Sequence, residues 1–192
     1  MASVRLFIAA DLGADLKQQL VACQRHLRDG FPDVKWVHAE AMHLTLQFLG
    51  DTPRERLDEL CLAVVPAAAG ATPLTCTVRG VGVFPGVRRP AVVWAGISSG
   101  GAALGQLAVR VRDGLAAAGF VTDPRPFSAH ITLGRVRQNA RVSPRAVEDV
   151  LKRWEEHDFG RMAVDQLTLY ASTLTPSGPL YESLRTWPLG RS

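Results

Sequence analysis

The sequence predicts a mixed α/β fold of two similar halves, on three observations. Segments with the hydrophobic spacing of strands alternate with segments that have the spacing of helices. A short strand–loop–helix pattern occurs twice, from His43 and from His130, which indicates approximate twofold symmetry. Apolar residues make up 47% and charged residues 21% of the 192 positions, a globular composition that excludes disordered and fibrous proteins. No long linker interrupts the chain, so we expect residues 1–192 to form one unit.

Seven segments have the pattern of β-strands. The first contains a short apolar run that stops at Asp11, which is too short for a signal peptide and typical of a strand. The predicted strands are 4–11, 43–49, 74–81, 91–97, 130–136, 164–172 and 180–187.

Four segments have helical spacing of their apolar residues. Thr52 is the predicted N-cap of the second helix, with Pro53 at its first position and Glu55 three residues after the cap. Ser143 and Pro144 begin the fourth helix in the same way. The predicted helices are 14–28, the segment that follows residue 52, about 102–118, and 143–154.

Arginine dominates the basic side of the composition. The net charge is +4 and the isoelectric point is near 9.3. Several arginines, such as Arg88 and Arg89, lie in turn-like segments. A guanidinium group can donate two hydrogen bonds to one phosphate, but the same pattern also suits a solubilising surface. The charge is therefore compatible with a nucleic-acid partner without establishing one.

The cysteines and the apolar runs indicate the cellular compartment of the protein. Cys23, Cys61 and Cys76 are odd in number and form no C-x-x-C pair, which favours reduced thiols and a cytoplasmic protein. No apolar run approaches the ~18 residues that a membrane span needs. Nothing suggests an obligate assembly, so we expect a soluble monomer with no membrane partner.

Two predicted strands carry a histidine and a threonine on one face. Side chains alternate along a strand, so His43 and Thr45 share a face, as do His130 and Thr132. The residues between them are apolar and suit burial against helices. If the two halves face each other, a cleft holds two imidazoles and two hydroxyls.

These groups suit metal-independent chemistry at phosphorus. One imidazole can deprotonate an attacking water or hydroxyl while the other protonates the departing oxygen, and each role is worth roughly 10²–10⁴ in rate. Threonine hydroxyls can donate to the non-bridging oxygens. Because an ordinary imidazole titrates near pH 6.5, we expect a bell-shaped rate profile with limbs near neutrality.

Two alternatives to this interpretation stay open. The first alternative is that the histidines are structural. This is usual for a single histidine beside a threonine, but two matching four-residue motifs are hard to explain by chance. Two histidines could also begin a zinc site, although neither strand offers an Asp, Glu or Cys on the same face. His26, His38 and His157 are isolated in the sequence and are predicted to lie at the surface.

At these residues the sequence resembles the two-histidine phosphoesterase superfamily, which is defined by paired H-x-T-x motifs. Within it, the sequence is most similar to the RNA 2′,3′-cyclic phosphodiesterases, also called 2′-5′ RNA ligases. The resemblance covers nearly the whole chain, and Ala129 departs from it where members usually carry proline. The matching blocks are 5–9, Trp36, 43–50, 84–85, 92–96, 127–135 and 178–182.

The resemblance implies a bilobal fold, with antiparallel strands lining a central cleft and helices outside. It also implies that His43 is the general acid for the leaving 3′ oxygen, that His130 is the base for water, and that Thr45 and Thr132 hold the phosphate. The substrate would be an RNA or nucleotide end with a 2′,3′-cyclic phosphate, and the product a 2′-phosphomonoester. The reverse reaction would join ends through a 2′-5′ linkage without ATP or another cofactor.

Two further substrate-binding residues are predicted, each five residues after a motif histidine. Arg135 matches an arginine of the family pattern, but a regular strand would turn it away from the phosphate. A bend or the strand end could return it to that face. Phe48 could stack on a base, at ~1–3 kcal/mol, or pack in the core. Core positions are predicted for the tryptophans, Trp36, Trp94, Trp154 and Trp187.

One assay separates the phosphodiesterase from a binding module without catalysis and from a metallohydrolase. We expect hydrolysis of a nucleoside 2′,3′-cyclic phosphate to survive a chelator and to be lost in both His43→Ala and His130→Ala. Loss on chelation with rescue by zinc would identify the metallohydrolase. Binding without turnover would identify the binding module.

Overall fold

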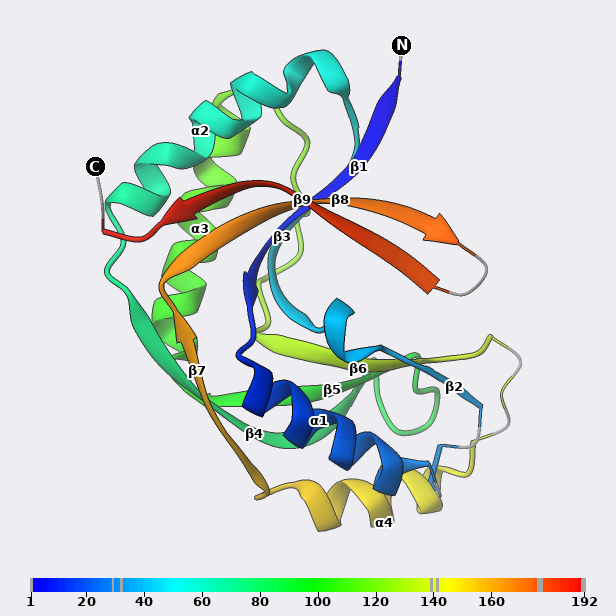
Figure 1. Ribbon diagram of the computed structural model, residues 1–192. Coiled ribbons are helices and arrows are strands. Elements are labelled where there is room, and N and C mark those ends of the chain that lie inside the picture. The colour runs from blue at the N-terminus through cyan, green and yellow to red at the C-terminus, as the bar shows by residue number, and fades with distance from the viewer. Residues whose placement is uncertain are drawn as a thin grey trace.

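A curved antiparallel sheet with helices outside it forms the fold (Figure 1). The computed structural model describes residues 2–28, 30–31, 33–138, 140, 142–175 and 178–190. Its strands are β1 (Ser3–Asp11), β2 (Val34–Trp36), β3 (His43–Pro53), β4 (Leu74–Phe84), β5 (Val92–Ser99), β6 (His130–Val136), β7 (Asp158–Val164), β8 (Gln166–Thr175) and β9 (Gly178–Pro188). Its helices are α1 (Ala14–Leu27), α2 (Leu57–Ala69), α3 (Gly101–Ala117) and α4 (Pro144–Trp154), with 3₁₀ turns η1 (Ala39–Ala41) and η2 (Arg54–Arg56).

The sheet consists of two four-stranded lobes that meet at β3 and β6. The strand order is β7-β4-β5-β6-β3-β1-β8-β9, and β2 pairs with β6. We call β3, β1, β8 and β9 the β1 lobe, and β6, β5, β4 and β7 the β5 lobe. The predicted bilobal α/β fold is confirmed, but the lobes are not the two halves of the sequence. The early strand β4 lies in the β5 lobe, while the late strands β8 and β9 lie in the β1 lobe.

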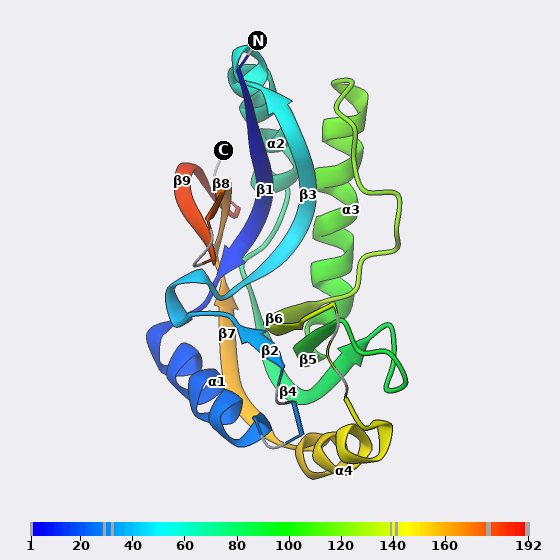
Figure 2. The same cartoon turned by 90° about the vertical axis from the view of Figure 1, so that its right-hand side faces the viewer.

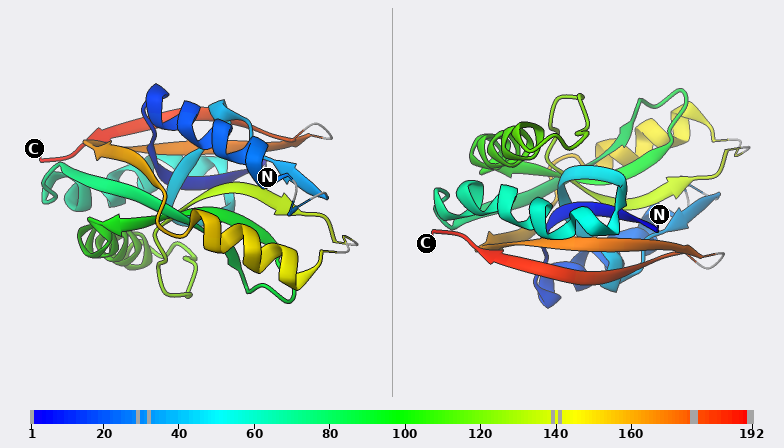
Figure 3. Two further views of the ribbon diagram at one scale, coloured as in Figure 1. Left: turned by 90° about the horizontal axis from the view of Figure 1, so that it is seen from below. Right: turned by 90° about the horizontal axis from the view of Figure 1, so that it is seen from above.

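Helices cover the lobes at opposite ends of the molecule. Helices α2 and α3 lie side by side at one end, whereas α1 and α4 lie at the other (Figures 1 and 2). The view from below shows α1 and α4 in front of the strands of the sheet (Figure 3). The predicted apolar stripe of α3 is fully buried, at Leu104, Leu107, Val111 and Leu115. No helix in the described ranges has both the length and the apolar character to cross a bilayer.

One predicted helix start is wrong and the other is confirmed. Strand β3 runs on to Pro53, and α2 begins only at Leu57 without a side-chain cap. Thr52 is buried instead, because its backbone continues the ladder with β1. Ladder pairing therefore overrides the local capping signal. Ser143 does cap α4, where its Oγ accepts a hydrogen bond from the backbone N–H of Ala146 at 3.5 Å.

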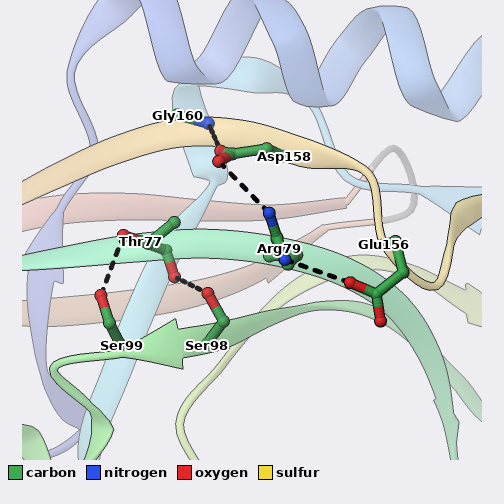
Figure 4. Close-up of polar contacts among 7 residues, drawn as sticks. All are labelled: Thr77, Arg79, Ser98, Ser99, Glu156, Asp158 and Gly160. Carbon is green, nitrogen blue, oxygen red and sulfur yellow. Dashed lines mark hydrogen bonds and ion pairs between the residues drawn. The ribbon is translucent and has the colours of Figure 1, made fainter.

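The sequence analysis missed two strands, β2 and β7. β2 is only three residues long, too short for a visible pattern. β7 lies at the edge of the β5 lobe, where it pairs with β4. Arg79 of β4 contacts Glu156 at 3.1 Å and Asp158 at 4.0 Å there (Figure 4). These groups are exposed, so the ion pairs contribute little beyond the ladder itself.

The close packing of β2 on β6 leads to a testable prediction. A Cβ atom added at Gly134 would lie 2.4 Å from Val34 Cγ1 and 2.9 Å from Trp36 Cε3. We therefore expect Gly134→Ala to lower the free energy of unfolding by about 1–3 kcal/mol through overpacking, as measured by urea denaturation. Gly86→Ala is the control, since no atom lies within 4 Å of an added Cβ there. Equal stability of the two variants would contradict this packing.

Candidate active site

The two histidine motifs face each other across the junction of the lobes. Leu44 of β3 pairs with Ile131 of β6, and both side chains are fully buried. Continuing this antiparallel register sets His43 opposite Thr132 and sets Thr45 opposite His130. The four side chains lie on the face opposite the buried pair. The structure thus brings together the residues that the sequence pattern singled out.

A β-bulge returns Arg135 to this face. Relative to β5, strand β6 holds one extra residue, Leu133, immediately after Thr132. An extra residue reverses the alternation of side chains beyond it. The carbonyl of Leu133 accepts hydrogen bonds from the Gln24 side chain of α1 at 2.8 Å and from the Val37 N–H at 2.9 Å. The bulge is therefore supported from two sides, and Arg135 lines the cleft.

The first motif carries an equivalent bulge. Relative to β1, strand β3 holds an extra residue, Leu46, between the pairs made by Thr45 and Gln47. Phe48 consequently lies on the same face as Thr45 and is 37% exposed. The guanidinium of Arg5 lies 5.0 Å from the centroid of its ring. The core alternative for Phe48 is wrong, and its ring is available at the cleft.

The cleft has two ends that share Thr45, Thr132 and Arg135. One end contains His43 in a cavity of about 130 Å³, which we call the His43 pocket. The other contains His130 and Phe48 in a wider hollow of about 440 Å³, which we call the His130 pocket. The two imidazoles therefore flank one shared set of hydroxyl and guanidinium groups. This arrangement can hold one phosphate with a proton-transfer group on each side.

Both imidazoles are held in the same way. Nδ1 of His43 contacts the carbonyl oxygen of Ala41 at 2.8 Å, and Nδ1 of His130 contacts that of Ser128 at 2.7 Å. A carbonyl only accepts, so each Nδ1 carries the hydrogen. In the neutral ring this leaves Nε2 as an acceptor. Each Nε2 can therefore take a proton or, once protonated, donate one.

Aromatic rings pack around each histidine, and the sequence analysis did not predict them. The ring of Phe7 stacks on His43 with 4.6 Å between centroids, and Tyr181 meets His43 edge-on at 5.3 Å. Phe84 meets His130 edge-on at 5.1 Å. These contacts join segments far apart in the chain, so periodicity within a segment could not reveal them.

Two residues that the sequence analysis did not assign to the site also line the cleft. His38 is exposed, as predicted, but it lines the His43 pocket. Trp36 packs partly against the core and also lines this pocket. Trp187 is buried and Trp154 packs against the core, as predicted. Trp94 is only half-buried, and its ring centroid lies 5.0 Å from that of Phe84.

Burial sets the protonation of the site. Loss of hydration lowers the pKa of His43 to about 4, although the hydrogen bond to Ala41 and the charge of Asp11 act in the opposite direction. Loss of hydration also lowers the pKa of His130. The positive charge of Arg135 adds to both shifts. Both imidazoles are therefore neutral at pH 7 in the free protein.

Asp11 anchors the strand beside His43. Its carboxylate accepts hydrogen bonds from Thr168 Oγ1 at 2.8 Å and from the Tyr170 hydroxyl at 2.5 Å. Burial and the neighbouring Asp11 raise the pKa of Tyr170 to about 12, so this hydroxyl stays a donor. Within the described ranges, no group of three or more His, Cys, Asp or Glu side chains is placed to hold a metal ion.

Comparison with known proteins agrees with this geometry. The sequence matches the family described as LigT-like phosphoesterase over residues 11–94 and 96–181, and each match contains one histidine motif. It is 35% identical over 184 residues to an RNA 2′,3′-cyclic phosphodiesterase of Archaeoglobus fulgidus, covering 96% of this chain and 99% of the relative. A protein of the same name from Thermotoga maritima is 33% identical over 184 residues, covering 94% of this chain and 93% of the relative. The structure of Escherichia coli LigT complexed with 3′-AMP has a TM-score of 0.77 and 29% identity, covering 99% of this chain and 100% of that one.

The burial of His43 predicts a loss of stability in acid. Its folded-state pKa of about 4 lies below its ordinary value of 6.5. The contribution of the neutral ring is therefore complete above pH 6.5 and is lost as the pH falls toward 4. We expect protonation of His43 to lower the free energy of unfolding by at most about 3 kcal/mol between pH 6.5 and pH 4.

Urea denaturation at pH 7, 5.5 and 4.5 measures this loss in the wild type, in His43→Gln and in the exposed control His157→Gln. The acid loss should shrink only in His43→Gln. An identical loss in all three proteins would assign the effect to other groups.

Proposed function

This chain belongs to the LigT-like phosphoesterase family, and we propose that it hydrolyses 2′,3′-cyclic phosphates at RNA or nucleotide ends through His43 and His130. The observation that carries the proposal is the register at the lobe junction, which presents both motifs on one face. The names of its relatives support the same activity.

The groups of the cleft suit in-line displacement at phosphorus. Thr45, Thr132 and Arg135 would hold the non-bridging oxygens and stabilise the charge that develops on them. Nε2 of His130 takes a proton from water as the water oxygen bonds to phosphorus. Nε2 of His43 gives a proton to the 3′ oxygen as the bond from that oxygen to phosphorus breaks. The product is a 2′-phosphomonoester. A ribose 5′-hydroxyl that attacks phosphorus in place of water, with the same loss of the 3′ oxygen, would give a 2′-5′ linkage.

The acid must acquire its proton in spite of its burial. In the free protein His43 is neutral at pH 7, because its pKa is about 4. The negative charge of a bound phosphate favours the imidazolium, and the carboxylate of Asp11 acts in the same sense. Substrate binding thus supplies the charge that keeps His43 protonated for its role. Phe48 would stack on a base at the other end of the cleft.

The cellular setting is part of the proposal. The chain would work as a single bilobal unit and as a monomer in the cytoplasm. Its three cysteines are unpaired and buried, which is compatible with a reducing compartment. No cofactor enters the steps above.

The rate profile against pH tests the paired imidazoles. Since kcat/KM reports the free enzyme and burial lowers the pKa of both histidines, we expect both limbs of a bell below pH 6.5. This moves the profile to more acidic pH than the sequence alone predicts. Above its maximum, kcat/KM should fall by about tenfold per pH unit.

The measurement uses a nucleoside 2′,3′-cyclic phosphate between pH 4 and 9, with identification of the 2′-phosphate product. His157→Ala should reproduce the wild-type curve, because this exposed ring lies outside the cleft. A profile without an alkaline limb would refute acid catalysis by a histidine.

A further inference from the structure

Helix α1 buries an amide among apolar side chains. Gln24 is 5% exposed and lies on the same face of the helix as Leu20 and Leu27, which are fully buried. Burial of an amide in apolar surroundings costs free energy unless hydrogen bonds replace those lost to water. An apolar side chain would pack at this position without that cost. The polar character of Gln24 must therefore be explained by what its amide contacts.

The amide of Gln24 joins three elements of the fold. Its Nε2 donates one hydrogen bond to the carbonyl of Leu133 in β6 and another to the carbonyl of Val37, each at 2.8 Å. The Val37 N–H donates to the same Leu133 carbonyl at 2.9 Å. Both N–H groups of the amide and both acceptor positions of that carbonyl are thereby used. The bond to Val37 also fixes the direction in which the amide donates to Leu133.

The carbonyl that Gln24 binds belongs to the bulge of the second motif. Leu133 is the extra residue of that bulge, because Thr132 and Gly134 pair with consecutive residues of β5. An extra residue stands outside the ladder, so groups from other elements must satisfy its backbone. Without the bulge, the alternation of side chains would turn Arg135 away from the cleft. The place of Arg135 therefore depends on what holds the bulge.

We propose that Gln24 is a positioning residue of the phosphate site: its amide holds the β6 bulge and so keeps the Arg135 guanidinium on the cleft face. Gln24 lies in the core and acts on the phosphate only through Arg135, which lines both ends of the cleft. The inference rests on the proposed function and adds to it a residue outside the cleft that sets the affinity for phosphate.

A double-mutant cycle on the full chain tests this coupling. Gln24→Met keeps a side chain of similar length and removes both N–H donors. We expect it to lower kcat/KM for a nucleoside 2′,3′-cyclic phosphate by at least about tenfold, because the charge-assisted contact of Arg135 with phosphate is weakened. In the Arg135→Ala background the same substitution should change kcat/KM by less than about twofold, since the group through which it acts is gone.

Two further variants separate positioning from stability. Leu20→Ala removes a fully buried side chain one turn earlier in α1. It should lower the temperature of thermal unfolding and leave kcat/KM of the folded protein unchanged. Gln24→Asn keeps the amide but sets it back by one methylene group, and it takes the place of Gln24→Met if that variant does not fold. Its loss of kcat/KM should likewise disappear in the Arg135→Ala background.

The cycle can also be measured without any reaction, on the Kd of inorganic phosphate by calorimetry. Here too the weakening caused by Gln24→Met should be confined to proteins that keep Arg135. A loss by the same factor in both backgrounds, a matching loss in Leu20→Ala, or no loss in Gln24→Met overturns the positioning role. Failure of the wild-type protein to hydrolyse any cyclic phosphate overturns the proposed function instead, and the phosphate cycle then decides the role of Gln24.

Discussion

The site depends on how β3 and β6 pair at the junction of the lobes. Leu44 and Ile131 pair there, and because both are buried, a slip of one residue would turn the motif side chains into the core. The apolar members of the motifs thus fix the position of the polar members. Each lobe provides one histidine and one threonine, so neither lobe contains the candidate site alone. Packing in the core and geometry in the cleft are two effects of the same register.

Each motif strand also contains a β-bulge directly after its threonine, and the bulge decides which face the following side chains occupy. In both motifs the fourth residue is the extra one, Leu46 in β3 and Leu133 in β6. The bulges bring Phe48 and Arg135 to equivalent places in the two motifs, each on the cleft face of its strand. The pseudo-symmetry of the chain therefore reaches beyond the four motif residues, while the chemistry of the two equivalent positions differs. The first motif offers an aromatic ring there and the second a cation.

Much of this could be predicted from local patterns, and the remainder depends on contacts between distant segments. Alternation along the two motif strands was sufficient to place histidine and threonine together. Family resemblance pointed to Arg135, but periodicity turned it the wrong way, because a bulge depends on partners such as Gln24 in another element. Thr52 has every feature of a cap and is still part of a strand, since β1 offers its backbone a ladder. Tyr181 comes to the cleft only through the pairing of β8 and β9 with β1.

The interleaving of the lobes has a consequence for how the protein is made on the ribosome. β1 and β3 emerge early, but the second edge of β1 pairs with β8, as Arg5 with Ser172 and Ala9 with Thr168. Until the last few dozen residues are synthesised, that edge has no strand beside it. Long-range pairing of this kind slows folding and leaves an unpaired edge open to association with other chains. A nascent chain of this topology would therefore need protection from aggregation until its C-terminal hairpin is complete.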